Sequence, residues 1–389
     1  MSKKLFYRSI RKVTGSKKHF LHEPLFNNKE VKVVSKNVKT SFVSSAGKTT
    51  IEFEKKIKDF TKAKYCIAMT SGTSALQVSL LSSGVNPNDE VLVPALTFVG
   101  TANSISHCGA IPHFVDSCIN DFGIDVIKLK YYLKKNFLIK KNKLINKKTK
   151  RVVKAIIPVH IFGHACSIFE INKLAKMYRL KVIEDAAEGL GSFYYGKHLG
   201  TFSSFGCLSF NGNKIITTGG GGAILTNNKK DYIHAKHLAT TAKVPHKYKY
   251  IHDKVGYNYR MPSLNAALGI AQMNKIRQFI KAKRNLFLCY KKSFSKLNYV
   301  KIFEENNNSI SNYWLQTAIL DRKKSKYKKA IIEYCISKGL YVRPSWTLLS
   351  KLKPYMKCPK MDLKGAKDIE KRIINLPSSQ GILLKKNKL

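Results

Sequence analysis

Short apolar runs alternate with segments of helical periodicity between residues 49 and 185, and this alternation limits the fold more than any other feature. The apolar runs predict buried strands at 65–69, 90–94, 112–116, 153–159 and 181–185, and the segments beside them predict helices at 49–63, 71–83, 97–107 and 168–178. A β-α-β series favours a mostly parallel central sheet with helices on both faces. We therefore expect an α/β fold in which ligands bind at the carboxyl ends of the strands.

The pattern changes near residue 256, where longer helical segments such as 261–290 replace the strand and helix alternation. We expect a large domain at 30–255, a smaller C-terminal α+β domain at 256–389 and an N-terminal basic arm at 1–29. The Lys- and Asn-rich segment at about 128–154 has little room for a core face, so it predicts a solvated, partly helical excursion rather than a binding patch.

The chain is strongly basic, with 71 Lys and Arg against 23 Asp and Glu, a formal net charge of +48. Its 44% hydrophobic content excludes a wholly disordered basic protein. Only ten of the basic residues are Arg, although nucleic-acid readers favour its planar donors. Without a helix-turn-helix, zinc-finger or aromatic RNP-type pattern, charge-driven nucleic-acid binding is a remote alternative, and no specific nucleic-acid partner is expected.

The sequence contains no run of 18 apolar residues, and its first 20 residues lack the apolar segment of a secretory signal. We therefore expect a cytoplasmic protein without membrane insertion. The eight cysteines are scattered, with no Cys-x-x-Cys pair and no His at zinc-ligand spacing, so the sequence predicts reduced thiols and no metal site.

Residues 70–75 lie between a predicted strand and a predicted helix. The backbone N–H groups of Gly72 and Thr73 and the Thr73 hydroxyl would then lie at a helix N-terminus, where a phosphate binds favourably. Taken alone, an ordinary Ser/Thr helix cap is the commoner explanation of this pattern.

Lys214 differs from most of the 61 lysines because apolar runs flank it and Gly219–Gly222 follow it. Partial burial favours a neutral, nucleophilic amine that forms a Schiff base, although a lysine that extends to solvent from a strand end is commoner. Asp185 ends a predicted strand in the same region, where a helix cap explains it equally well. Together, a phosphate cradle, an amine and an anion are the three anchors that pyridoxal phosphate requires.

Ordered sequence blocks cover roughly residues 23–380, and they include Ser44–Gly47, Thr70–Leu76, Pro94–Phe98, Pro158–His164, Ile183–Glu188, Ser209–Lys214, Gly256–Met261, Ser311–Leu315, Arg343–Trp346 and Asn375–Ser379. In these blocks the chain resembles the DegT/DnrJ/EryC1/StrS family of PLP-dependent sugar-nucleotide aminotransferases, and within it the LegC-like branch. The resemblance implies the PLP-dependent transferase fold type I, which is aspartate aminotransferase-like, with pyridoxal 5′-phosphate as cofactor.

The resemblance also implies individual roles. Lys214 is expected to form the Schiff base and Asp185 to hold the pyridine nitrogen, so these two are the expected catalytic residues. Further cofactor contacts are expected from Gly72, Thr73, Phe98, Glu188, Ser209 and, from the neighbouring subunit of a homodimer with shared active sites, Asn258. Substrate contacts are expected from Tyr259, Arg260, Arg343 and Trp346.

Two positions depart from the wider family. Glu188 stands where Gln or His is common, and Gly220 stands where Glu is usual. Both departures resemble the LegC-like branch. A second carboxylate beside Asp185 is expected to raise the pKa of one member of the pair.

By resemblance, the reaction moves the amino group of glutamate to C4 of a nucleotide-linked, N-acetylated 4-keto-6-deoxy hexose. The product would serve surface glycans, including lipopolysaccharide, or an acid of the legionaminic type. A sugar dehydratase of the same fold is an alternative, but those relatives replace the lysine with His, and Lys214 is present. A catalytically silent homologue is a further alternative, to which Glu188 gives some support.

Overall fold

The computed structural model describes residues 3–45 and 47–384. Residues 1–2, 46 and 385–389 lie outside the described part of the chain, so the predicted N-terminal arm, the Ser44–Gly47 block and the C-terminal domain are each described only in part.

The central sheet has a main path of seven strands, in the spatial order β1 (Tyr65–Met69), β11 (Gly222–Thr226), β10 (Phe205–Ser209), β7 (Lys181–Asp185), β6 (Val152–Ile156), β2 (Glu90–Pro94) and β3 (Ile111–Val115). The strands from β10 to β3 pair in parallel. Strand β11 is antiparallel to both of its neighbours, so β1 runs in the same direction as the parallel group. The predicted mostly parallel sheet is confirmed.

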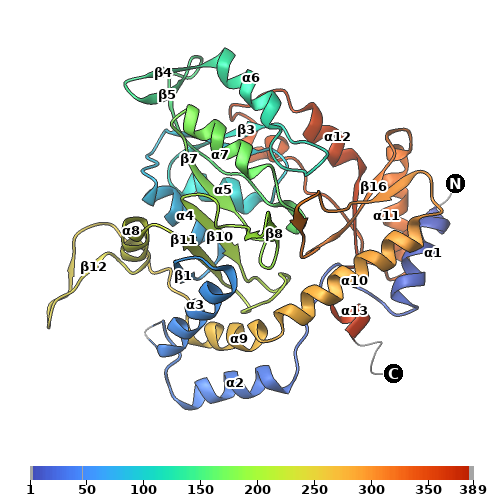
Figure 1. The fold of residues 1–389 in the computed structure, drawn as a ribbon, viewed down its shortest axis with the longest axis horizontal. Coiled ribbons are helices and arrows are strands. Elements are labelled where there is room, and N and C mark those ends of the chain that lie inside the picture. The colour runs from blue at the N-terminus through green and yellow to red at the C-terminus, as the bar shows by residue number, and fades with distance from the viewer. Residues whose placement is uncertain (1–2, 46, 385–389) are drawn as a thin grey trace.

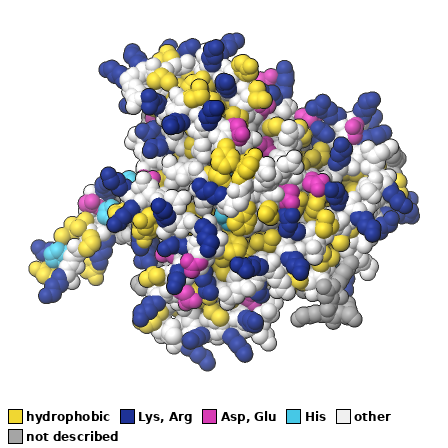
Figure 2. Space-filling view, in the orientation of Figure 1, with side chains coloured by type: hydrophobic (Ala, Val, Ile, Leu, Met, Phe, Trp, Pro, Cys, Tyr) yellow, Lys and Arg dark blue, Asp and Glu magenta, His cyan; other side chains and the backbone are white. Residues whose placement is uncertain are grey.

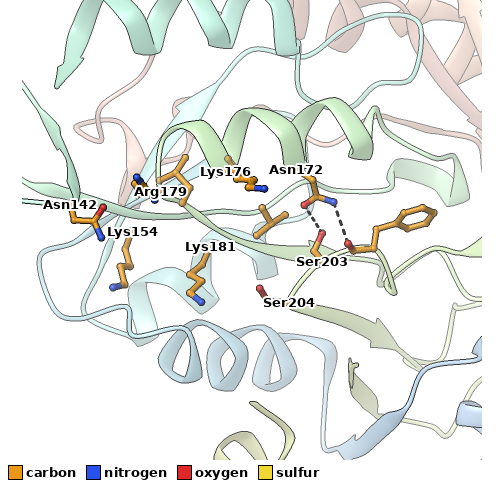
Figure 3. A pocket seen from close by; sticks show the side chains of 12 residues that line it. Asn142, Lys154, Asn172, Lys176, Arg179, Lys181, Ser203 and Ser204 are labelled. Atoms are coloured by element: carbon orange, nitrogen blue, oxygen red, sulfur yellow. Dashed lines mark hydrogen bonds between the residues drawn. The ribbon is translucent and has the colours of Figure 1, made fainter. Parts of the chain in front are cut away.

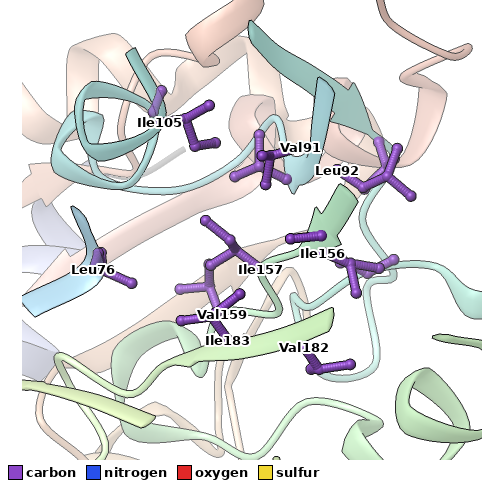
Figure 4. Close-up of a cluster of buried hydrophobic side chains, with 14 of the residues drawn as sticks. Leu76, Val91, Leu92, Ile105, Ile156, Ile157, Val159, Val182 and Ile183 are labelled. Atoms are coloured by element: carbon purple, nitrogen blue, oxygen red, sulfur yellow. The ribbon is translucent and has the colours of Figure 1, made fainter. Parts of the chain in front are cut away.

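Helices cover both faces of this sheet (Figure 1). Helices α4 (Gly72–Ser82) and α5 (Val99–His107) contact each other on one face, with α8 (Lys229–Ala239) beside α4, and α7 (Ile168–Met177) lies on the other face. Figure 4 shows Ile105 of α5 beside Val91 of β2, and Leu76 of α4 and Ile183 of β7 belong to the same buried cluster. Strands covered on both faces need almost continuous apolar runs, which explains the sequence pattern.

The Lys-rich segment contains most of α6 (Val126–Asn136) and a hairpin of β4 (Phe137–Lys140) and β5 (Lys143–Asn146), which extends β6. The segment is partly helical as expected, but it has more of a core face than expected, because Leu129 and Leu133 of α6 are buried one helical turn apart. The buried Glu90 carboxylate also accepts hydrogen bonds from Asn146 and Thr149, which fixes the hairpin to the sheet.

The small domain contains a four-stranded antiparallel sheet in the order β14 (Val300–Ile302), β16 (Gln316–Leu320), β18 (Ile373–Leu376), β17 (Arg343–Pro344). Its helices are α11 (Lys328–Ser337), α12 (Lys364–Arg372) and α13 (Gly381–Leu384). The remaining short strands are β8 (Phe193–Tyr194), β9 (Lys197–His198), β12 (Lys243–Val244), β13 (Ile251–His252) and β15 (Ser309–Ile310).

The N-terminal residues are not a free arm. Residues Lys3–Thr14 form α1, whose buried Phe6 and Ile10 pack in the core of the small domain against α10 (Ile276–Phe294) and α11. The spacing of these side chains is that of an amphipathic helix, so the basic residues between them occupy the opposite face.

The boundary between the domains also differs from the expected position at 255/256. Helix α9 (Ser263–Met273) packs against α2 (Asn28–Lys39) and α3 (Lys48–Thr61) beside the central sheet. Along α10, Phe279 belongs to the same cluster as α9, whereas Leu286 belongs to the core of the small domain. The packing therefore changes inside α10, which a change in sequence pattern at residue 256 does not show.

Lysine and arginine side chains are spread over the whole visible face rather than gathered in one stripe (Figure 2). None of the helices in the part of the chain that the structure describes is both long and apolar enough to cross a bilayer.

Lys283 of α10 differs from the other lysines in residues 3–45 and 47–384, because its side chain is completely buried. Its Nζ donates hydrogen bonds to the backbone carbonyls of Trp314 (2.9 Å) and Ser378 (2.6 Å), and it joins α10 to two segments of the small domain. Burial lowers the pKa of Lys283 well below its ordinary value of 10.5.

We expect the free energy of unfolding to rise with pH below 10.5 through Lys283, because the unfolded chain binds a proton there that the folded chain releases. The maximal contribution is about 1.4 kcal/mol per pH unit. The Lys283→Met variant should lose this slope in urea unfolding between pH 7 and 10. The Lys281→Met variant, at an exposed position of the same helix, should keep it; equal slopes in all three proteins would contradict the prediction.

Candidate active site

A cavity of about 370 Å³ opens at the carboxyl ends of β1, β7 and β10. This volume is typical of small-molecule sites. Its walls carry eight of the residues predicted from the sequence, namely Gly72, Thr73, Phe98, Asp185, Glu188, Ser209, Lys214 and Trp346. The structure therefore brings together segments that are up to 274 residues apart (346 − 72 = 274).

The N-terminus of α4 forms one wall. Ser71 caps the helix by accepting a hydrogen bond from the Ser74 N–H (3.0 Å), so the predicted helix cap is present. The cap leaves the N–H groups of Gly72 and Thr73 at the cavity, where an anion binds favourably. A Cβ on Gly72 would lie 3.0 Å from the Ser209 Cβ, so glycine permits the close approach of α4 to the end of β10.

Asp185 lies at the end of β7, and its side chain is buried. One carboxylate oxygen accepts a hydrogen bond from the Thr101 hydroxyl (2.8 Å), and the other accepts from the Ala187 N–H (3.1 Å). Burial raises the pKa of Asp185, although these hydrogen bonds and the charge of Lys214 oppose the increase. Because no helix begins after Asp185, its carboxylate is not a helix cap, and Asp185 lines the cavity.

Lys214 enters the cavity from the loop after β10, and its side chain is only 12% exposed. Its Nζ lies 3.2 Å from Glu188 Oε1 and 4.0 Å from the centre of the Trp314 ring. Burial raises the pKa of Glu188, while the positive charge of Lys214 lowers it.

Two aromatic residues that were predicted from the sequence face the same cavity. Phe98 precedes α5 and is 54% exposed, so it offers an open ring face to a planar ligand. Trp346 comes from the small domain and stacks on Phe162, with the ring centroids 5.0 Å apart. The site therefore combines residues of both domains.

Four other predicted contacts do not line this cavity: Asn258, Tyr259, Arg260 and Arg343. Tyr259 donates a hydrogen bond from its hydroxyl to Gln77 (3.3 Å), and its ring stacks on Tyr257. Asn258 and Arg343 are exposed. The roles of these four residues stay predictions.

Sequence reasoning missed two residues that shape the site. Thr101 fixes the Asp185 carboxylate, and Trp314 lies beside the Lys214 ammonium and donates a hydrogen bond from its indole N–H to the Asn213 carbonyl (2.7 Å). Trp314 stood inside a recognised sequence block but had no assigned role. The sequence around Trp314 does not indicate that its ring contacts Lys214, which lies 100 residues away in the chain.

The model of the DegT/DnrJ/EryC1/StrS aminotransferase family matches residues 24–387, which is nearly the whole chain. The chain belongs to this family. GDP-perosamine synthase from Escherichia coli O157:H7 is 35% identical over 362 residues, which cover 92% of each chain. A UDP-4-amino-4,6-dideoxy-N-acetyl-β-L-altrosamine transaminase from Campylobacter jejuni is 28% identical over 88% of each chain.

The solved structure of Helicobacter pylori PseC, an aminotransferase, has the same fold. It superposes with a TM-score of 0.85 over 96% of each chain at 24% sequence identity. The predicted PLP-dependent transferase fold is therefore confirmed.

The side chains of this DegT/DnrJ/EryC1/StrS family member fit pyridoxal phosphate. The buried Asp185 carboxylate has no cationic hydrogen-bond partner among the described residues, and a protonated pyridine nitrogen would supply one. The α4 N-terminus offers N–H groups to the phosphate, and the Lys214 amine lies in the same cavity. In residues 3–45 and 47–384, no cluster of three or more His, Cys, Asp or Glu side chains could hold a metal ion.

Gly220, where the family usually has Glu, lies at the wall of the cavity. A Cβ at this position would meet no atom within 4 Å, so the space for a larger side chain exists and is left open in this chain. Glycine at position 220 therefore leaves more space at this wall of the cavity than glutamate would. No neighbouring atom requires a glycine there.

Proposed function

We propose that this protein transfers the amino group of glutamate to C4 of a nucleotide-linked 4-keto-6-deoxy hexose. The cofactor of this aminotransferase is pyridoxal 5′-phosphate. The observation that carries the proposal is the convergence of Lys214, Asp185 and the α4 N-terminus in one cavity.

Pyridoxal phosphate, when bound, supplies an electron sink for the carbon that loses a proton. Asp185 keeps a negative charge where the ring nitrogen would be protonated, and it stabilises charge that develops in the transition state. Lys214 Nζ would accept the proton that the substrate carbon loses and donate it again within the site, so the lysine would act as both base and acid. The net reaction converts glutamate and a ketosugar to 2-oxoglutarate and an aminosugar.

The acceptor proposal has two supports beyond the cavity. One relative is named as a synthase of GDP-perosamine, and another as a transaminase of a UDP-linked 4-amino-4,6-dideoxy-N-acetyl sugar. The departures at Glu188 and Gly220 resemble the LegC-like branch, so we favour an N-acetylated acceptor and a product for surface glycans or a legionaminic-type acid. A basic surface attracts an acceptor that carries a diphosphate. A cytoplasmic location stays a prediction.

Incubation with glutamate and a panel of nucleotide-linked 4-keto and 3-keto sugars tests this function. Glutamate should bleach the visible absorbance of the bound cofactor, and mass spectrometry with NMR should show an amino group at C4 of one sugar. An amino group at C3 would refute the positional assignment. Failure of every amino donor to bleach the cofactor would refute aminotransfer itself and favour a catalytically silent homologue.

We also propose a homodimer with shared active sites. Asn258 is exposed and lies outside the cavity of its own chain, and the β12–β13 hairpin nearby projects from the body of the protein (Figure 1). The hairpin region exposes Tyr248 and Tyr250, which are 75% and 83% accessible, and burial of such rings on a second chain is favourable.

We expect a mixture of two inactive variants to recover activity if the sites are shared. Lys214→Ala and Asn258→Ala subunits would form a mixed dimer in which one site carries both changes and the other carries neither. Unfolding and refolding the two variants together should restore up to about one quarter of wild-type activity, since half of the dimers are mixed and each has one intact site. No recovery, with dimers present in sedimentation analysis, would contradict the proposal.

A further inference from the structure

A hollow separate from the candidate active site lies at the other end of the central strands. It has a volume of about 600 Å³ and lies near the amino ends of β6 and β7 and the C-terminal end of α7. Strand β7 begins beside the hollow at Lys181 and ends in the active site at Asp185, so the two places are separated by a five-residue strand, roughly 13 Å.

Four cations line this hollow: Lys154, Lys176, Arg179 and Lys181. No Asp or Glu is among the residues that line it. Within the described part of the chain, none of the four cations forms an ion pair, so no carboxylate balances their charge at the hollow. Figure 3 shows the ammonium groups of Lys154 and Lys181 directed to the same side of the neighbouring strands.

Helix polarity explains only part of this arrangement. Lys176 and Arg179 lie at the C-terminal end of α7, where the helix dipole favours positive charge. Lys154 and Lys181 belong to β6 and β7 and gain no comparable stabilisation. Arg179 also has a left-handed backbone (φ 59°), a conformation in which glycine or asparagine is usual after a helix. Four like charges around one hollow repel each other, and a bound anion would remove this repulsion.

Neutral hydrogen-bonding groups complete the wall, and their positions are fixed. Ser203 donates a hydrogen bond from its hydroxyl to Asn172 Oδ1 (3.0 Å), and the Asn172 amide donates to the Phe202 carbonyl (3.3 Å). The buried Glu184 carboxylate accepts from the N–H groups of Phe202 and Ser203 (2.7 and 2.8 Å). The loop that closes the hollow is therefore held in place before any ligand binds.

An aromatic face adjoins the cations. Phe202 lines the hollow and packs edge-on against Phe169, with the ring centroids 5.2 Å apart. Lys197 Nζ lies 4.9 Å from the centre of the Phe202 ring, on the same loop region. Phe202 therefore bounds the hollow, and its ring is already in contact with Phe169 and Lys197.

We propose that this hollow binds the diphosphate group of a small molecule, at a site separate from the active site. The volume accommodates a nucleotide, and the four cations match the charge of a diphosphate. The diphosphate can come from a nucleotide or from inorganic pyrophosphate. The inference does not depend on the reaction at Lys214, because no residue of the hollow lines the active-site cavity.

Isothermal titration of the cofactor-loaded enzyme with pyrophosphate, UDP and GDP tests this site. The Lys154→Gln/Lys181→Gln variant should bind pyrophosphate at least ten-fold more weakly than the wild type and should still be bleached by glutamate. The matched control is Lys134→Gln/Lys135→Gln, which removes the same charge from exposed positions of α6 and should bind as the wild type does. Arg179→Gln is a second, independent variant that should also weaken binding if the strand substitutions disturb folding.

Each outcome decides the proposal. The relevant site is the one that Lys154→Gln/Lys181→Gln loses. If UDP or GDP binds there more tightly than pyrophosphate, the ligand is a nucleotide. If all three bind equally, the site recognises the diphosphate group alone. Absence of saturable pyrophosphate binding to the wild type overturns the proposal. An equal loss of affinity in the α6 control also overturns it, because the binding would then reflect diffuse surface charge. Because glutamate bleaching is measured separately, failure here is distinguishable from failure of the aminotransferase assignment.

Discussion

Replacing Lys214 with alanine should reduce the turnover number by about 10⁴-fold or more and remove the covalent attachment of the cofactor. Two separate functions of the amine would be lost, because Nζ is expected both to attack the cofactor aldehyde and to take the proton that the substrate carbon loses. The measurements are steady-state kinetics with glutamate and an acceptor, and the mass of the borohydride-reduced protein.

The matched control for Lys214→Ala is Lys229→Ala, an exposed lysine at the start of α8. This variant should keep both the adduct and the turnover of the wild type. Lys214→Arg retains positive charge beside Glu188 and Trp314 but not a nucleophilic amine, so it should fold normally and remain inactive. Turnover within ten-fold of the wild type in Lys214→Ala would show that another group does the chemistry.

Replacing Asp185 with asparagine should lower the turnover number by about 10³-fold. The same substitution should make the apo-protein more stable at neutral pH. The activity falls because the anion that holds a proton on the cofactor ring is gone. The stability rises because a buried carboxylate has been removed, and the burial of that carboxylate raises its pKa above the ordinary value of 3.8.

The sign of the pH dependence follows from proton linkage. As the pH rises above 3.8, the unfolded chain ionises at Asp185 before the folded chain does, so the folded state loses stability up to its raised pKa. The advantage of Asp185→Asn should therefore vanish near pH 4 and be complete above the raised pKa of the folded protein. Denaturant unfolding of both apo-proteins at several pH values measures it. A less stable variant at pH 7 would contradict the prediction, and Thr101→Val controls for loss of a hydrogen bond alone.

The central sheet was predictable because its strands obey a strong physical requirement. Strands buried on both faces need almost continuous apolar runs, as β1 shows, and the helices between them must present apolar side chains to the sheet. Lys214 and Asp185 stood out as candidates because an amine and a carboxylate beside apolar runs are uncommon, but their expected roles came from the family resemblance.

The remaining features depend on contacts between distant segments. The buried face of α1 is visible as a helical pattern, but nothing in its sequence specifies α10 as its partner. Leu129 and Leu133 were obscured by the lysines around them, so α6 seemed to lack a core face. Local patterns predict helices and strands, whereas partners at a separation of hundreds of residues depend on the packing of the whole chain.

Trp314 and Trp346 are the two tryptophans of this protein, and both line the candidate active-site cavity. All indole emission from the chain therefore originates at the walls of one site. A ligand that changes the polarity there, or absorbs near the emission wavelength, alters the entire tryptophan fluorescence without background from other regions. The protein thus contains its own optical probe, and stopped-flow fluorescence can follow cofactor and substrate binding without a label.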